Sequence, residues 1–325
     1  MKIHSYPEKY CFVRPVVTVG TFDGVHQGHR EIIRKLKQIA QDVQGEAVVV
    51  TLWPHPRITL KKTENNFFLL NTLQERIKLL SSLEVDHLVV FPFSENYARL
   101  SYTQFIDNIL IKNIGVHHLL LGTNNHYGNN KEGNTTSIAG YAAQKGIEVS
   151  QAPLVQIDGT KISSTLIRNL LLEGKVEQAT ALLGQPYPLS GKVVPGDKLG
   201  TQLGFPTLNL EIPESGKLIP PDGVYAVTVD EVIPSSSLKG MMYIGTRPSL
   251  KKEEKKRRIE VHLFNFTENL YGREVWINVI RRMREEMAFT TLEELKNQIN
   301  KDKITILNFF QNNYEHIDSY RKSPL

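Results

Sequence analysis

Two histidines near the start of the chain are spaced to act on one phosphoryl group. His26 and His29 lie three residues apart in GTFDGVHQGHR (20–30), directly before a helical pattern. If the helix has begun there, both imidazoles share one face, and Gly28 between them lets a phosphate approach the backbone. A helix start offers unpaired N–H groups to an anion, and imidazoles can donate hydrogen bonds to the charge that builds in a transition state. The segment predicts nucleotidyl transfer in which the second substrate supplies the attacking phosphate.

Other interpretations of this segment stay open. HxGH alone is no stronger than a pair of polar helix-cap residues. Zinc binding has little support, because the sequence has no HExxH, no cysteine cluster and no obvious third ligand nearby. A P-loop is excluded, because GxxxxGK[ST] does not occur.

A second stretch strengthens the phosphate interpretation. ISSTLIR (162–168) opens another predicted helix, with Ser163, Ser164 and Thr165 at its start and Arg168 three residues later. Hydroxyls, free N–H groups and a guanidinium at a helix start make a phosphate cradle. Alone, this stretch reads better as a Ser/Thr cap. Together with HxGH, the phosphate interpretation is favoured.

A different pattern for handling phosphate lies in SGKVVPGDKLGTQLGFPTLNL (190–210). Gly196 and Gly200 bracket a turn that carries Asp197 and Lys198. If the segment that follows is extended, its polar side chains at alternate positions point the same way, and their oxygens are hard ligands suited to Mg²⁺ with ATP phosphates. These side chains are Thr207 and Asn209. Without further context, the stretch reads as a Gly/Pro-rich interdomain loop.

A candidate general base lies downstream in RIEVHLFNF. In a strand, Ile259, Val261 and Leu263 share one face, and Glu260 and His262 share the other. A carboxylate fixed on a rigid strand can receive the proton of a substrate hydroxyl. The alternative is an ordinary exposed strand glutamate.

The elements around the histidines alternate between strands and helices. Apolar runs at 16–20, 47–52, 87–93, 117–122 and, more weakly, 146–154 are separated by helical periodicity at 29–43, 72–83, 103–113 and 136–146. Such alternation predicts a parallel sheet covered by helices on both faces, a doubly wound, Rossmann-like α/β domain. Its ligand should lie at the carboxyl ends of the strands.

The pattern changes from about residue 186. Extended runs at 223–232, 240–245, 257–266 and 273–283 follow with no long helix between them, which predicts an antiparallel β-barrel or a strongly curved sheet. A terminal helix should begin at Thr290 or Thr291, with Glu293 and Glu294 in its first turn. We therefore expect two domains, 1–185 and 186–325.

Composition agrees with a two-domain enzyme. The 325 residues are 40% hydrophobic and 22% charged, and the net charge of +5 suits anionic ligands or nucleic acid. The chain has no run of 18 apolar residues, no secretion signal and a single cysteine, Cys11, so we expect a cytoplasmic protein without a disulfide. The run KKEEKKRR (251–258) reads as a solvated hairpin loop rather than an RNA- or membrane-binding patch.

The first half resembles the FMN adenylyltransferase module of bacterial FAD synthetases, a nucleotidylyltransferase family. The resemblance implies that His26 and His29 act on the ATP phosphates. It assigns ATP or phosphate binding to Gly20, Phe22, Asp23, Gly28, Ser163, Ser164, Thr165 and Arg168. Four ordered motifs carry it: FDGVHQGH (22–29), TLWPHP (51–56), LLGTNNHYG (120–128) and ISSTLIR (162–168).

The 122–128 loop departs from that family. It is implied to hold the adenine or the flavin nucleotide, through Asn124 and Asn125. Family members usually carry Gly–aromatic–Asp–aromatic there, whereas this chain has Gly-Thr-Asn-Asn (122–125), and Leu166 stands where Arg is common. Asn keeps hydrogen-bonding capacity but loses the charge. A kinase whose first domain has decayed is therefore one alternative, although His26, His29 and Arg168 are intact.

The second half resembles riboflavin kinases along its whole length. The resemblance implies a small β-barrel with a C-terminal helix, Thr207 and Asn209 on Mg·ATP, and Glu260 as base on the ribityl 5′-hydroxyl. The Gly196–Gly200 loop, with Lys198, would cover the phosphates; Thr201 stands where an Arg often follows. The ordered motifs are GFPTLN (204–209), PPDGVYAV (220–227), YIGTRPS (243–249), IEVHLFNF (259–266) and LYGREV (270–275).

Together the two resemblances identify the chain as a member of the bifunctional riboflavin kinase/FMN adenylyltransferase family. They imply that ATP phosphorylates riboflavin to FMN and then adenylylates FMN to FAD, with Mg²⁺ as the only metal. We expect small-molecule substrates, no nucleic acid or membrane partner, and a monomer or weak oligomer. The alternative from another class is a nucleic-acid-binding regulator on the same scaffold.

Overall fold

The computed structural model describes most of the chain, in two compact units, Met1–Ser164 and Thr165–Pro324. The described residues are 1–6, 9–60, 67–123, 127–129, 132–157, 159–197, 199–214, 216–233, 236–246 and 257–312. Most of the KKEEKKRR run, 251–256, lies outside them, as do Asn124, Asn125 and Lys198.

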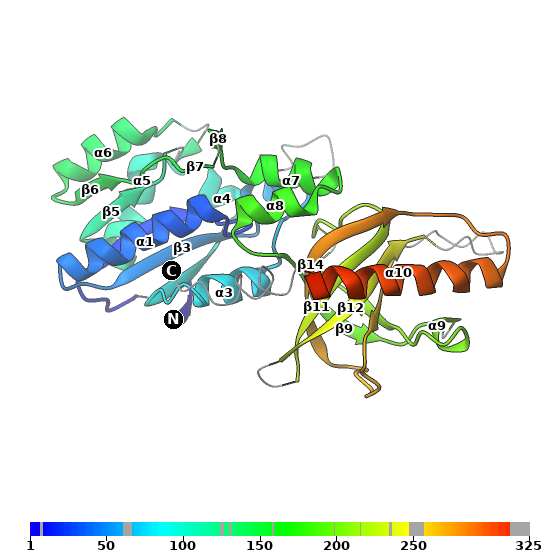
Figure 1. Ribbon diagram of the computed structural model, residues 1–325. Coiled ribbons are helices and arrows are strands. Elements are labelled where there is room, and N and C mark those ends of the chain that lie inside the picture. The colour runs from blue at the N-terminus through cyan, green and yellow to red at the C-terminus, as the bar shows by residue number, and fades with distance from the viewer. Residues whose placement is uncertain are drawn as a thin grey trace. The chain divides into compact units, whose positions relative to one another are not determined.

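The first unit is built on a six-stranded parallel sheet, which confirms the predicted doubly wound α/β fold (Figure 1). The strand order is β1-β4-β3-β2-β5-β6. The strands are β1 (Lys2–Ser5), β2 (Val16–Gly20), β3 (Ala47–Trp53), β4 (His87–Pro92), β5 (His118–Leu121) and β6 (Glu148–Gln151). Successive residues of the central strands are buried on both faces, because helices cover both sides of the sheet.

The strand order places a topological switch point beside β2. The chain moves from β2 to β3 and β4 in one direction and then returns to β5 on the other side of β2. Ligands of open α/β sheets bind at such a point, outside the carboxyl ends of the strands. The GTFDGVHQGHR segment leaves β2 there, and Gly122 and Thr123 follow β5 at the same edge.

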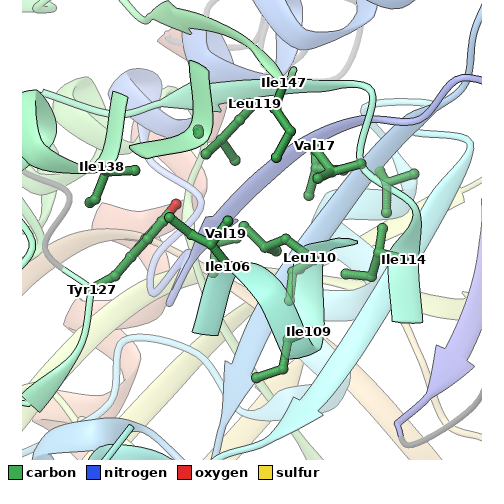
Figure 2. Close-up of a cluster of buried hydrophobic side chains, with 14 of the residues drawn as sticks. Val17, Val19, Ile106, Ile109, Leu110, Ile114, Leu119, Tyr127, Ile138 and Ile147 are labelled. Carbon is green, nitrogen blue, oxygen red and sulfur yellow. The ribbon is translucent and has the colours of Figure 1, made fainter. Parts of the chain in front are cut away.

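Helices pack on this sheet through apolar side chains. The helical elements are α1 (Gln27–Asp42), α2 (Pro56–Thr59), α3 (Leu73–Ser81), α4 (Glu95–Ala98), α5 (Tyr102–Phe105), a π-helix η1 (Ile106–Ile114) and α6 (Thr135–Gln144). Figure 2 shows Ile106, Ile109, Leu110 and Ile114 of η1 packed in one cluster with Val17 of β2. The helix predicted over 103–113 is thus a short α-helix continued as a π-helix.

Some short elements were not predicted. β1 pairs with β4 at the edge of the sheet, and its four residues KIHS carry no continuous apolar run that would mark a buried strand. A two-stranded ribbon joins β7 (Gln156–Ile157) to β8 (Thr160–Lys161).

The second unit is a closed antiparallel barrel, as predicted, and it has six strands. The order around it is β10-β13-β12-β11-β14-β9. The strands are β9 (Tyr187–Val194), β10 (Leu208–Glu211), β11 (Gly223–Ile233), β12 (Ser236–Gly245), β13 (Arg258–Leu263) and β14 (Glu274–Glu285). The Gly/Pro-rich stretch that begins near 186 therefore contributes β9 to the barrel wall. Its helices are α7 (Ser164–Leu172), α8 (Val176–Leu183), α9 (Leu199–Gln202) and α10 (Leu292–Asn312).

Helix α10 covers one outer face of the barrel (Figure 1). Its Ile306 and Phe310 are buried in one cluster with Val224, Ala226 and Met241 of the strands. The predicted cap is present: Glu294 N donates to Thr291 Oγ1 at 3.1 Å, and Thr291 N donates to Glu294 Oε2 at 3.3 Å. An ion pair also fastens the helix, because Arg284 Nη2 of β14 lies 2.7 Å from the buried carboxylate of Asp302.

The linking helix α8 packs against the barrel. Val176, Ala179 and Leu183 are buried, and the helix contacts β9 and β14. Arg281 of β14 forms an ion pair with Glu177 at 3.3 Å. The second compact unit therefore begins at Thr165, before the predicted boundary at 185/186.

Candidate active sites

The two histidines of HxGH lie ring against ring at the start of α1. The helix begins at Gln27, so His26 is its N-cap rather than a residue inside it, and its side chain accepts the His29 N–H at 3.3 Å. The ring centroids are 3.7 Å apart, with 13° between the planes. The capping role of His26 therefore does not prevent both rings from facing one ligand.

One ring nitrogen of His29 has no hydrogen-bond partner among the residues that the structure describes. This atom, Nδ1, is enclosed by the protein. Burial, the neighbouring His26 ring and the Arg76 guanidinium hold the pKa of His29 well below its usual range. The ring is therefore neutral at neutral pH, with one N–H to donate and one lone pair.

The glycines of this loop make room for aromatic rings. A Cβ on Gly28 would lie 3.2 Å from Nδ1 and Cε1 of His26, and one on Gly20 would lie 3.1 Å from the Phe22 ring. Phe22, buried at φ 48°, packs beside His29 at 5.1 Å between centroids. In the structure Gly28 thus leaves space for His26 itself, in addition to any approach of a phosphate.

Asp23 ties the loop to a distant segment. Its fully buried carboxylate accepts N–H groups from Leu70 at 3.1 Å and Asn71 at 3.0 Å. In return, Gly24 N donates to Asn71 Oδ1 at 2.8 Å, with Gly24 at φ 93°. These contacts favour a positioning role for Asp23, although its predicted part in phosphate binding stays a prediction.

Arg76 is a residue that the sequence reasoning missed. Its fully buried guanidinium lies 3.6 Å from Asp23 Oδ1 and donates to Thr51 Oγ1 at 3.2 Å and to the Leu52 carbonyl at 3.3 Å. The available signal was Thr72-x-x-Glu75, a capping box that fixes the start of α3 at Leu73, three residues before Arg76. A charge buried this completely must be paired, and here it supports the loop that carries the histidines.

The second predicted phosphate stretch begins where expected. Helix α7 starts at Ser164, whose Oγ donates to the Asp23 carbonyl at 2.9 Å. Ser163 directly precedes the helix. Thr165 and Arg168 follow within it, and Arg168 is buried. Ser164 is thus joined to the HxGH loop by a direct hydrogen bond.

In the barrel, the three predicted kinase residues lie side by side. Asn209 of β10 is paired in register with Glu260 of β13. Thr207, directly before β10, donates from Oγ1 to Glu260 Oε2 at 3.4 Å. Glu260 is only 7% exposed, so the alternative of an exposed strand glutamate is wrong. The strand alternates as predicted, but both of its faces are covered.

Two predicted glycines are required by these side chains. A Cβ on Gly196 would overlap the Asn209 carboxamide, and one on Gly200 would meet the Phe205 carbonyl and lie 3.2 Å from Thr207 Oγ1. Between them, Asp197 forms an ion pair with Arg258 at the start of β13. Gly196 therefore packs directly on Asn209, and Gly200 packs on Thr207.

The oxygen donors of the barrel constellation suit a hard cation. Among the described residues, no group of three or more His, Cys, Asp or Glu side chains could hold a metal ion. Thr207 Oγ1, the Asn209 carboxamide oxygen and the Glu260 carboxylate are nevertheless hard oxygen donors. They fit Mg²⁺, which usually takes one or two protein ligands and completes its shell with phosphate and water.

Two family models match the two halves of the chain. A model described as FAD synthetase matches residues 11–166, and one described as riboflavin kinase matches residues 183–310.

Curated relatives match nearly the full length. The bifunctional riboflavin kinase/FMN adenylyltransferase of Bacillus subtilis is 36% identical over 92% of this chain and 93% of its own. The proteins of the same name from Buchnera aphidicola and Escherichia coli are 35% and 33% identical, over 90% and 94% of this chain and 93% and 94% of their own.

A solved structure is similar over most of the chain. A crystal structure from Streptococcus pneumoniae, named a macrolide-efflux protein, has a TM-score of 0.83 at 29% identity and covers 94% of this chain and 99% of its own. In the described part of this chain, no helix is long and apolar enough to cross a membrane. The similarity to the solved structure supports the fold of this chain, and the printed name is that of the other protein.

Proposed function

Because the chain belongs to the bifunctional riboflavin kinase/FMN adenylyltransferase family, we propose that each of its two constellations carries one of the family's reactions. The enzyme phosphorylates riboflavin to FMN with ATP and then adenylylates FMN to FAD. The assignment of each reaction to particular residues is the proposal.

Adenylylation is assigned to the HxGH loop. The FMN phosphate oxygen attacks the α-phosphorus of ATP, and the bond to pyrophosphate breaks. His26 and His29 donate N–H groups to phosphate oxygens as charge builds on them. Ser163, Ser164, Thr165 and Arg168 bind the triphosphate, and the Asn124–Asn125 segment holds a nucleotide. The observation that carries this assignment is the enclosed Nδ1 of His29, beside a stacked second imidazole on a loop that Asp23 fixes.

Phosphorylation is assigned to the barrel. Glu260 accepts the proton of the ribityl 5′-hydroxyl, whose oxygen attacks the γ-phosphorus of ATP while ADP leaves. The observation that carries this assignment is the placement of Thr207 Oγ1 3.4 Å from Glu260 Oε2, with Asn209 paired to Glu260 in register. Thr207 and Asn209 would hold Mg²⁺, which neutralises phosphate charge when it is bound. Gly196, Lys198 and Gly200 belong to the loop proposed to cover the phosphates.

One incubation tests the central proposal against its alternatives. We expect riboflavin, ATP and Mg²⁺ to yield FMN and then FAD. FMN alone would support the kinase-only alternative, which rests on the altered 122–128 loop. If neither FMN nor FAD forms, both assignments are contradicted. RNA binding with strong salt dependence would then favour a nucleic-acid-binding regulator.

The cellular setting is also proposed. We place the enzyme in the cytoplasm as a monomer or weak oligomer acting on small molecules, because it uses ATP and carries one cysteine. Fractionation of cells and sedimentation of the purified protein test these two points.

A further inference from the structure

We infer that His262 is a positioning residue for the kinase reaction, which holds Thr207 against Glu260 through a hydrogen bond to the Pro206 carbonyl. The inference rests on the proposed roles of Thr207 and Glu260. The geometry that carries it is the end of the β10–β13 ladder.

The ladder stops just before the segment that must present Thr207. The paired residues are Leu208 with Val261 and Asn209 with Glu260, and pairing ends there. Pro206 has no N–H to donate, so the backbone cannot extend the strand pairing through it. The Pro206 carbonyl instead lies 2.9 Å from Nδ1 of His262. A side chain of β13 thus holds the segment where the backbone pairing ends.

This hydrogen bond fixes the state of the ring. A carbonyl oxygen only accepts, so Nδ1 carries the hydrogen of this bond, and in the neutral ring Nε2 is then a lone pair. Nε2 is enclosed and has no hydrogen-bond partner within the described ranges, and the whole residue is 6% exposed. The bond to Pro206 is therefore the only polar contact of the ring in the part of the chain that the structure describes.

Stability alone does not explain a histidine at this position. The ring lies against Phe205 and Phe264, and the Lys303 ammonium of α10 lies over both of those phenyl rings. Burying an unsatisfied ring nitrogen among such groups is unfavourable, and leucine, of similar volume, would avoid this cost. What leucine could not supply is a donor that fixes the residue before Thr207.

Two substitutions separate the donor from the ring. In His262→Asn, the amide nitrogen can take the place of Nδ1 and keep the bond to Pro206. In His262→Leu, the volume stays and the donor is lost. Loss of one hydrogen bond predicts a KM for Mg·ATP about five- to tenfold higher in H262L, with the KM for riboflavin unchanged. H262N should stay within about twofold of the parent enzyme.

The measurement is steady-state FMN formation by the full chain, with adenylylation of supplied FMN and the melting temperature as checks that each variant is folded. A merely structural histidine would move both KM values and the melting temperature together. Thr207→Ala gives the reference effect, and T207A/H262L should have the same KM for Mg·ATP as T207A, because His262 acts through Thr207.

The outcomes distinguish the inference from the proposal beneath it. If T207A raises the KM for Mg·ATP but H262L does not, or if H262N is impaired as much as H262L, the role of His262 is refuted. Additive effects in the double variant would also refute it. If T207A itself leaves this KM unchanged, the assignment of Thr207 fails instead.

Discussion

Replacing His29 by alanine tests whether the HxGH loop performs chemistry or only caps a helix. The substitution removes an imidazole whose Nδ1 is enclosed and has no partner within the described part of the chain. It leaves the Asp23 contacts that hold the loop intact, because those run from the carboxylate to Leu70 and Asn71. We therefore expect a folded protein with a defective adenylylation step.

The size of the effect follows from the number of donors lost. Removing one preorganised donor to a developing oxyanion costs about 10²–10³ in rate, or about 2.7–4 kcal/mol. His29 contributes one neutral ring and therefore one N–H, so a single-donor loss is expected. His29→Asn places an amide N–H near the position of Nδ1 and should recover part of the rate.

The assay uses the second reaction of the same chain as its control. FAD formation from supplied FMN should fall by about 10²–10³ in H29A, while FMN formation from riboflavin should be unchanged, because Glu260 and Thr207 lie in the other unit. An adenylylation rate equal to that of the parent enzyme would reduce His29 to a cap residue. An equal loss of both activities would indicate damage to the whole protein.

The pKa of His29 adds a pH criterion. A histidine pKa held well below 6.5 keeps the ring neutral through neutral pH, so protonation of His29 begins only under more acidic conditions. The dependence of kcat/KM for adenylylation on pH should therefore show no inflection near 6.5 that disappears in H29A. Such an inflection would show that His29 titrates as an exposed imidazole and would contradict the burial argument.

The remaining predictions concern the barrel. Glu260→Gln should lower FMN formation by about 10²–10⁴, the usual share of a general base, and spare adenylylation of supplied FMN; near-normal turnover would mean that another group, or none, takes the proton. Asp302→Ala should lower the free energy of unfolding by about 3–5 kcal/mol in urea titrations, because it leaves Arg284 without its buried partner; a loss below about 1 kcal/mol would show that this ion pair contributes little. A fragment that begins at Lys175 should keep kinase activity and be more stable than one that begins at Pro186 by about 2–4 kcal/mol, because it retains the buried Val176 and Leu183 of α8. Equal stability of the two fragments would show that α8 adds nothing to the barrel.

Much of the architecture could be predicted from the sequence because periodicity is local. The buried runs at 16–20 and 47–52 became β2 and β3 with nearly the predicted bounds. The change to period-two patterns after 186 marked the barrel, and the Thr291 and Glu294 pair marked the start of α10. Each of these features depends on neighbours a few residues away.

Part of the candidate chemistry could also be predicted from the sequence, because its residues lie close together along the chain. HxGH combines a helix start, a glycine and two imidazoles within four residues. GFPTLN places a hydroxyl and an amide at alternate positions of one extended segment. The family resemblance then linked the two patterns to two reactions, which the family models and the curated relatives support.

Tertiary structure alone decided what holds these groups in place. Asp23 is captured by backbone N–H groups 47 and 48 residues away, and the buried Arg76 comes from the same distant segment. Burial of Glu260 depends on how the second face of β13 is covered, and Gly196 is required because the Asn209 side chain packs against it. These contacts join residues far apart in sequence, and they form only when the sheet and the barrel close, so no local pattern of residues could encode them.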